Sequence, residues 1–170
     1  MSSRVLGRDI RRAGSGNAGA TNMARVYGMS AGVLTLGGDA VLGTREYWWN
    51  DPESLPAYLN QYGMAYPFSG LQSLFVSDDM TFINLECALK DDGKGEQTSR
   101  LWRFRGLTSY TEALWQGSIE QVNIANNHYG DYGTAGEEST RHALIDAGMP
   151  FSGYGYTYVW EKNGHKIGFA

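Results

Sequence analysis

Three short apolar runs constrain the fold of this chain most strongly, because each of them leads directly into a cluster of polar residues. The run 33–36 leads through two glycines to Asp39, the run 80–83 leads into Asn84-Leu85-Glu86, and the run 121–125 leads into Asn126-Asn127-His128. Short apolar runs bounded by turn signals are typical of buried strands. The helical patterns between them predict a layered α/β fold around a mostly parallel sheet. In such sheets ligands bind at the carboxyl ends of the strands, where all three clusters would lie.

The segments between these runs carry helical patterns, and the sequence finishes on a β-rich pattern. We expect helices at 54–62, 68–77, 109–115 and 134–147. The last of these is the strongest, because Gly148-Met149-Pro150 supplies a stop signal after it. Two β-rich stretches at 156–161 and 165–170 flank Asn163-Gly164, a dipeptide that predicts a β-hairpin. The sequence stops on that apolar strand without a polar tail, which we interpret as truncation.

Length and charge narrow the classes of function. The 170 residues are 42% hydrophobic and 19% charged, enough for one globular domain at 31–170 after a basic, glycine-rich leader at 1–30 that we expect to be disordered or loosely packed. A net charge of −4 offers no dominant positive field for a nucleic-acid partner. Because no apolar run approaches the roughly 20 residues of a membrane span and no signal core is present, the sequence as written predicts a cytoplasmic chain. The single Cys87 is expected to be a small buried hydrophobe.

The polar clusters contain the residue types that bind a hard or borderline divalent metal. Asp39, Glu86 and Asn127 supply oxygen ligands from separate strand ends, and His128 adds an imidazole that can protonate a leaving oxygen in phosphoester hydrolysis. A metal in such a site polarises phosphorus and activates water. Taken singly, Asp39 after two glycines also fits a turn residue or a helix cap, and Glu86 is equally ambiguous. The Asn-Asn-His cluster is less easily structural, because no strand propensity favours it.

The motifs around these clusters resemble those of the CapA family of capsule and poly-gamma-glutamate synthesis proteins. The resemblance covers about residues 33–170 and rests on the stretches 34–43, 82–89 and 124–133. It implies the N-terminal portion of a metallophosphatase-like fold, a bacterial source, and an anionic polymer or phosphoester as the substrate. It further implies that Asp39, Glu86 and Asn127 bind a divalent metal such as Mn, Zn or Fe, that His128 is the general acid, and that Asp131 orders the loop.

The resemblance also implies that part of the metal site is missing from this chain. The family's domain continues into a second half that contributes further histidine ligands, and family members are typically at the cell surface or anchored to the membrane. His142 lies in an expected helix and His165 in the expected hairpin, so neither replaces those ligands. We therefore expect a metal site that is incomplete in this chain and inactive alone. A noncatalytic polymer- or partner-binding module with a vestigial site is the alternative, and the sequence fixes neither the metal nor the oligomeric state.

The leader carries a different resemblance. Its composition suits phosphate binding, although a flexible basic leader would look similar. Over about residues 7–36 it resembles the signature of the PlsY-type glycerol-3-phosphate acyltransferases, so that the chain reads as a fusion of two fragments. The implied function, a fragment of an acyltransferase of phospholipid synthesis, is a further alternative. The implied phosphate-binding residues are Gly14, Ser15, Gly16, Asn17, Gly19, Thr21 and Asn22.

Aromatic residues are frequent in this chain. Its five tryptophans and eleven tyrosines would suit a stacking surface for carbohydrate or peptide. Ordinary packing in the core explains them as well, and it is the interpretation that we prefer from sequence.

Overall fold

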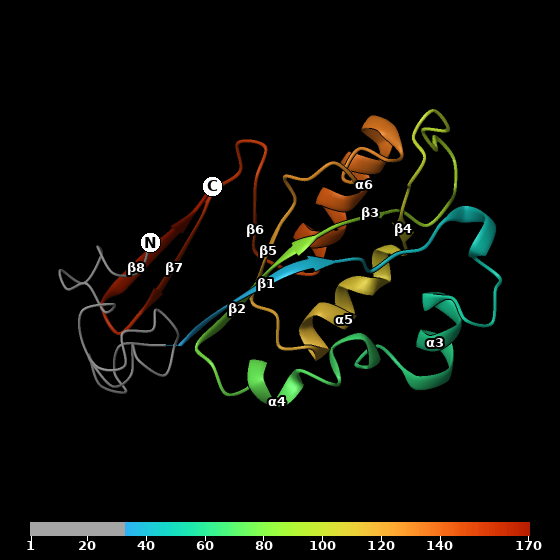
Figure 1. Ribbon diagram of the computed structural model, residues 1–170. Helices are drawn as coiled ribbons and strands as arrows, with labels where there is room; N and C mark the ends of the chain where they lie inside the picture. Colours follow the sequence, from blue (N-terminus) through green and yellow to red (C-terminus); the bar gives the residue numbers. More distant parts are fainter. Residues whose placement is uncertain (1–32) are drawn as a thin grey trace.

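The computed structural model describes residues 33–170, and Figure 1 shows how the helices and strands of this part are arranged. The expected leader at 1–30, with its phosphate-binding residues from Gly14 to Asn22, lies outside the described residues. In the described part, no helix is long and apolar enough to cross a membrane.

A four-stranded parallel sheet forms the centre of the fold. Its strands are β1 (Leu34–Ala40), β2 (Met80–Leu85), β5 (Gln121–Asn123) and β6 (Phe151–Ser152). They lie in the order β1-β2-β5-β6, and every neighbouring pair is parallel. The predicted α/β class and the three predicted strands are therefore confirmed. The short fourth strand was not predicted from sequence.

Helices fill the connections between these strands, as parallel strands require. Helix α3 (Leu55–Tyr62) begins after Ser54, whose hydroxyl accepts a hydrogen bond from the Ala57 N–H at 3.3 Å. Helix α5 (Thr111–Gln116) follows a 3-10 turn, η5 (Thr108–Tyr110). Helix α6 (Gly133–Asp146) is the longest of the described helices and packs against the short strand β3 (Ala88–Leu89). The helices predicted at 54–62, 109–115 and 134–147 are confirmed with shifts of one or two residues.

The prediction of one continuous helix at 68–77 is wrong. The segment 68–77 contains the end of a 3-10 turn, η4 (Tyr66–Phe68), and a single helical turn, α4 (Gln72–Phe75). Between them the Ser69 hydroxyl donates to the Tyr66 carbonyl at 2.8 Å, and Gly70 follows. A serine that binds the backbone and a glycine both weaken a helix, so the two short turns do not fuse. A further 3-10 turn, η3 (Glu46–Trp48), follows β1.

The predicted hairpin is confirmed as β7 (Tyr158–Lys162) and β8 (His165–Phe169), which pair antiparallel. Asn163 and Gly164 have φ values of 52° and 77°, the left-handed backbone that a two-residue turn needs at both central positions. The hairpin attaches to the sheet through stacking of Phe169 on Phe82, with ring centroids 5.1 Å apart. A second short parallel pair, β3 with β4 (Arg105–Gly106), lies beyond the end of β2.

The two faces of the sheet differ in chemistry. Ile83 and Val122 pair in register and lie in the buried core with Leu114 of α5 and Leu144 of α6. The residues that follow them at the carboxyl ends of these strands and point to the other face are polar, Asn84 on β2 and Asn123 on β5. Because side chains alternate across a strand, the apolar packing on one face places these polar side chains together on the other. The candidate site is built from that second face.

Candidate functional site

A row of three polar residues crosses the sheet at the carboxyl ends of its strands. Asp39 of β1 is paired in register with Asn84 of β2, and Asn84 is paired with Asn123 of β5. The side chains form a chain of hydrogen bonds along this row. Asn84 Nδ2 donates to Asp39 Oδ1 at 2.9 Å, and Asn123 Nδ2 donates to Asn84 Oδ1 at 2.9 Å. Three distant segments of sequence thus meet in one polar cluster.

Asp39 joins this row because β1 contains a bulge. The register advances three residues in β1, from Leu36 to Asp39, against two residues in β2, from Phe82 to Asn84. One extra residue of this kind moves every later side chain to the other face of a strand. Gly37 allows the close approach, since a Cβ there would lie 2.8 Å from Cγ2 of Ile83. The two glycines before Asp39 therefore make neither a turn nor a helix cap but re-aim an aspartate within a strand.

Asn84 is the hub of the cluster. Its amide nitrogen donates to Asp39 Oδ1 and also to Glu86 Oε2, so two carboxylates converge on one NH2 group. Its amide oxygen accepts hydrogen bonds from Asn123 Nδ2 and from Asn126 Nδ2 at 3.0 Å. All the hydrogen bonds that this primary amide can make with its two hydrogens and its oxygen lone pairs are thus in use.

Glu86 is a buried carboxylate with few favourable interactions to offset the cost of burying its charge. The residue is 8% exposed. Burial raises the pKa of its carboxyl above the usual 4.5, and the charge of Asp39 raises it further, while His128 and the hydrogen bond from Asn84 act in the opposite direction. The neighbouring Cys87 is fully buried as expected from sequence, and burial raises the pKa of its thiol to about 12. Two carboxylates, Glu86 and Asp39, therefore lie close together, and in the described part no Lys or Arg pairs with either of them.

The loop after β5 is held by the side chain of Asn126. Its Nδ2 donates to the Leu85 carbonyl at 2.8 Å, and its Oδ1 accepts from the backbone N–H groups of His128 at 3.0 Å and Tyr129 at 2.9 Å. This is the turn that asparagine favours through its own backbone contacts. Asn126 thereby fixes the position of His128 relative to β2.

His128 is oriented by Asp131, which is fully buried. Its Nδ1 lies 2.7 Å from Asp131 Oδ2. Asp131 also accepts from the Phe104 N–H at 2.8 Å and from Arg100 Nη1 at 3.0 Å. A carboxylate that accepts all these bonds assigns the hydrogen of the imidazole to Nδ1, which leaves Nε2 for another partner. The Phe104 ring packs against the imidazole, with centroids 4.7 Å apart.

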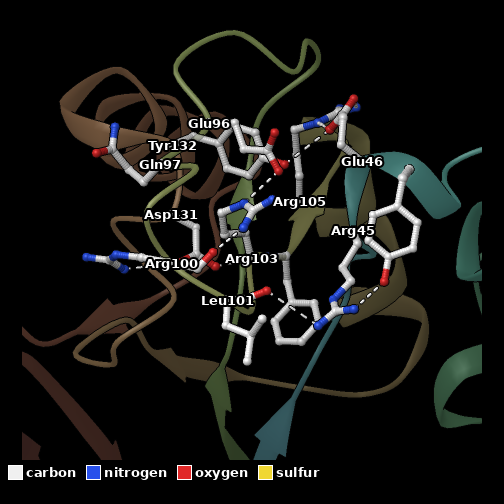
Figure 2. A network of polar contacts seen from close by, with 12 residues as sticks. Arg45, Glu46, Glu96, Gln97, Arg100, Leu101, Arg103, Arg105, Asp131 and Tyr132 are labelled. Atoms are coloured by element: carbon white, nitrogen blue, oxygen red, sulfur yellow. Dashed lines mark hydrogen bonds and ion pairs between the residues drawn. The ribbon is translucent and has the colours of Figure 1, made fainter.

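Figure 2 shows the network of arginines that holds the connecting segment between β3 and β4 in place over this loop. Arg103 pairs with Glu96 at 2.7 Å, and Arg100 contacts both Asp131 and the backbone carbonyl of Asn127. Arg105 is buried and binds both carboxylate oxygens of Glu46, at 2.8 and 2.9 Å. The segment is therefore a fixed wall next to His128.

A pocket of about 840 Å³ opens between this wall, the His128 loop and helix α6. Asn126, Asn127 and His128 line it, whereas Asp39 and Glu86 do not. Most of the remaining lining is aromatic or charged: Arg100, Trp102, Phe104, Tyr129, Asp131, Glu137, Glu138, Arg141, Tyr154 and Tyr156. His128 thus lies on the pocket side of the carboxylate cluster.

The structure brings some of the residues predicted from sequence into one cluster and leaves others outside it. Asp39 and Glu86 meet through Asn84, and Asn126 links that cluster to the loop of His128. Asn127 faces the pocket and contacts Arg100 through its backbone carbonyl. His142 and His165 are exposed on α6 and β8, away from the cluster. Among residues 33–170, no three His, Cys, Asp or Glu side chains form a group that could hold a metal ion.

Four contributors to this site were not predicted from sequence: Asn84, Asn123 and Asn126 as hydrogen-bonding hubs, and Arg100 as a partner of Asp131. The three asparagines carried a signal, because they lie within or beside the strand-end motifs. Arg100 carried none, since it reaches the site across 31 positions of sequence separation.

Comparisons with known proteins agree with the motifs. The model of the bacterial capsule synthesis protein family, PGA_cap, matches residues 33–169. The capsule biosynthesis protein CapA of Bacillus anthracis is 24% identical over 132 residues, which is 76% of this chain and 30% of that protein, so the chain spans about a third of this relative.

Short matches of a second kind are found to glycerol-3-phosphate acyltransferases. That of Syntrophotalea carbinolica is 66% identical over 35 residues, and that of Trichlorobacter lovleyi is 50% identical over 40 residues. These matches cover 18% and 21% of the two enzymes. The match to the capsule synthesis model, in contrast, covers the whole described fold with all three strand-end clusters. The chain therefore belongs to the bacterial capsule synthesis protein family PGA_cap, the CapA family that its motifs indicated.

Proposed function

We propose that this member of the capsule synthesis family has a divalent metal site at Asp39, Glu86 and Asn127 that is incomplete in this chain, and that the reaction of the complete site is phosphoester hydrolysis. The observation that carries the proposal is the convergence of two carboxylates on the single amide group of Asn84. Like charges placed this close together without a paired cation are costly unless a ligand uses them.

The donor set fits a hard or borderline cation such as Mn²⁺ or Zn²⁺. Asp39 and Glu86 offer carboxylate oxygens, and Asn127 offers an amide oxygen from the neighbouring loop. Asp39 and Asn127 are exposed, so a cation has access to the cluster from solvent. The bound metal would supply positive charge that polarises a phosphoryl group and favours attack by water.

His128 has the arrangement of a general acid. Asp131 fixes its Nδ1, so the protonated imidazole presents the hydrogen on Nε2 to a substrate. In hydrolysis, the oxygen of water forms a new bond to phosphorus while the bond from phosphorus to the leaving oxygen breaks. The leaving oxygen takes the proton of Nε2, and the proton lost by water restores the imidazolium. Asp131 and Phe104 hold the ring in place throughout.

Calorimetric titration of the purified chain with Mn²⁺ or Zn²⁺ tests the proposal. We expect saturable binding that weakens by tenfold or more in Asp39→Ala and in Asn127→Ala. The matched control is Asp92→Ala, because Asp92 is an exposed aspartate outside the cluster. Hydrolysis of p-nitrophenyl phosphate by the chain mixed with a supplied C-terminal half of the family's domain, measured with and without His128→Ala, then tests the reaction. Equal metal binding by the wild type and Asp39→Ala would contradict the metal site.

A noncatalytic polymer- or partner-binding role is the second candidate. It is favoured by the observation that residues 33–170 hold no group of three His, Cys, Asp or Glu side chains suited to a metal. This role predicts that an anionic polymer such as polyglutamate binds equally well in the presence of a chelator and to Asp39→Ala. Loss of polymer binding on removal of metal would exclude it.

The acyltransferase-like segment supports a separate proposal of glycerol 3-phosphate binding by Gly14, Ser15, Gly16, Asn17, Gly19, Thr21 and Asn22. The support is the 66% and 50% identity to two glycerol-3-phosphate acyltransferases over short stretches. Binding of glycerol 3-phosphate that disappears in Asn17→Ala would sustain the proposal, and no binding to the wild type would end it.

A further inference from the structure

The pocket beside His128 is much larger than the reaction at the carboxylate cluster requires. Its volume of about 840 Å³ is in the range that holds a whole small molecule rather than a single phosphoryl group. Asp39 and Glu86 lie outside its walls, whereas His128 lines it. A general acid must lie next to the leaving oxygen. A leaving group on the far side of His128 from the carboxylates would therefore occupy this pocket.

Two aromatic rings that line the pocket, those of Tyr154 and Trp102, are each held by a neighbouring side chain. Tyr154 stacks on Tyr129 with ring centroids 5.2 Å apart, and its hydroxyl donates to the Asn126 carbonyl at 2.9 Å. Trp102 lies in the segment between β3 and β4, and the guanidinium of Arg45 lies 3.5 Å from the centroid of the Trp102 ring. Tyr154 and Trp102 are 60% and 53% exposed, so each keeps a free face. Such faces attract the apolar side of a ring.

The backbone at Tyr154 is strained in a way that these contacts maintain. Its φ is +51°, a left-handed value that is uncommon for a residue with a side chain. The turn also brings Gly153 so close to Ala125 that a Cβ there would lie 2.7 Å from the Ala125 nitrogen. Backbone strain of this kind is concentrated at functional sites. The tyrosine is thus positioned at the pocket by an arrangement that packing alone does not favour.

Charged side chains around these faces have unused hydrogen-bonding capacity. Arg141 of α6 is half-buried, yet in the described part of the chain it forms no ion pair and no hydrogen bond. The carboxylates of Glu137 and Glu138, which precede it on the same helix, likewise lack partners among residues 33–170. The pocket therefore offers strong donors and strong acceptors side by side.

We propose that this pocket binds a sugar ring. A sugar has an apolar C–H face for Tyr154 or Trp102, and its hydroxyl groups both donate to carboxylates and accept from guanidinium groups. An isolated anionic group would use Arg141 but would be repelled by Glu137 and Glu138. Resting on the function proposed above, the sugar is the leaving group of the phosphoester, and His128 protonates the sugar oxygen as the bond to phosphorus breaks.

An NMR chemical-shift titration of the 170-residue chain with glucose and N-acetylglucosamine tests whether the pocket binds a sugar. A chelator in the buffer makes the result independent of any metal. We expect saturable shifts of the Trp102 indole and the Tyr154 amide at sugar concentrations on the order of millimolar to tens of millimolar. Arg141→Gln and Tyr154→Ala should each weaken binding about tenfold. Tyr154→Phe, which keeps the ring, should retain most of the affinity. Tyr62→Ala is the control, because Tyr62 is an exposed tyrosine outside the pocket.

The possible results separate this inference from the proposed function. No saturable shifts with either sugar, or stronger binding of adenosine than of both sugars, would overturn the assignment of a sugar even if metal binding is intact. With Mn²⁺ present, glucose 1-phosphate should bind more tightly than glucose. If the phosphate adds no affinity while Mn²⁺ itself binds, the pocket is not a leaving-group site. If Mn²⁺ fails to bind but the sugars do, the proposed hydrolysis fails and the sugar pocket stands.

Discussion

The substitution Glu86→Gln should stabilise the metal-free protein while it weakens metal binding. Glu86 and Asp39 accept hydrogen bonds from the two hydrogens of one amide group. Ordinary bonds of this geometry leave the two acceptor oxygens roughly 5 Å apart. Two unit charges at that distance repel by about 3 kcal/mol at an effective dielectric constant near 20, and by about 1 kcal/mol in bulk water.

The environment places the expected value between these limits. Glu86 is 8% exposed, but Asp39 faces solvent, so we expect a gain of about 1–2 kcal/mol in the free energy of unfolding. The glutamine oxygen can still accept from Asn84, and its amide nitrogen can donate toward Asp39. For a chain of this size, the gain corresponds to a rise in Tm of about 4 °C.

The pH dependence has a definite sign. Because the pKa of Glu86 is raised in the folded state, the folded chain binds more protons than the unfolded chain above the usual value of 4.5. Stability conferred by protonation is present at low pH and is lost as the pH rises through the raised pKa. The advantage of Glu86→Gln over the wild type should therefore be greatest at neutral pH and should shrink as the pH falls toward 4.5.

Urea denaturation at pH 7.5, with a chelator or with Mn²⁺, measures both effects. We expect Mn²⁺ to stabilise the wild type and to leave Glu86→Gln almost unchanged, since a ligand stabilises only the state that binds it. Glu53→Gln removes an exposed carboxylate outside both the cluster and the pocket and is the matched control. If Glu86→Gln is less stable than the wild type in chelator, the carboxylates do not repel one another as argued, and Glu86 has a structural role.

Three further predictions concern the frame of the site. Gly37→Ala should lower the free energy of unfolding by about 1–3 kcal/mol in urea and weaken metal binding in calorimetric titration, because its Cβ would lie 2.8 Å from Cγ2 of Ile83. Gly38→Ala is the control and should change neither quantity, because no atom lies within 4 Å of its Cβ. Arg105→Ala should lower the free energy of unfolding by about 3 kcal/mol in urea. The substitution removes the bidentate salt bridge to Glu46 and a guanidinium that lies 3.7 Å from the Trp49 ring centroid. The hydrogen bond from Arg105 holds the pKa of Glu46 below 4.5, so this contribution is present above 4.5 and is lost as the pH falls through the lowered pKa; acid titration should show a flatter loss of stability in Arg105→Ala.

The elements that sequence predicted well are those with a local signal. The three strands, the helix at α6 and the Asn163-Gly164 hairpin each carry their pattern within a few residues. The helix expected at 68–77 failed because Ser69 and Gly70 interrupt it, a local effect that outweighed the apolar periodicity. Strand β6 was missed because two residues carry no periodicity.

In the candidate site, too, some features could be predicted from sequence and others could not. Asp39, Glu86 and His128 could be chosen from sequence because each lies near the end of a recognisable strand or in the loop that follows it. Their mutual arrangement could not, because it depends on register: a bulge at Gly37 decides which face Asp39 occupies. The pocket was beyond reach, since Arg141 and Tyr154 join it only through packing.

Asparagine explains how the proposed cation site at Asp39 and Glu86 can fold without a cation. Asn84 donates to both carboxylates, so the amide partly substitutes for positive charge, and its oxygen is held by Asn123 and Asn126. Neutral amides satisfy the hydrogen-bonding capacity of the carboxylates without cancelling their charge. The carboxylates are thus oriented before any cation arrives, while most of their repulsion remains to be relieved by binding. In the proposed metal site, the same repulsion that lowers the stability of the metal-free fold would therefore be the source of the affinity for metal.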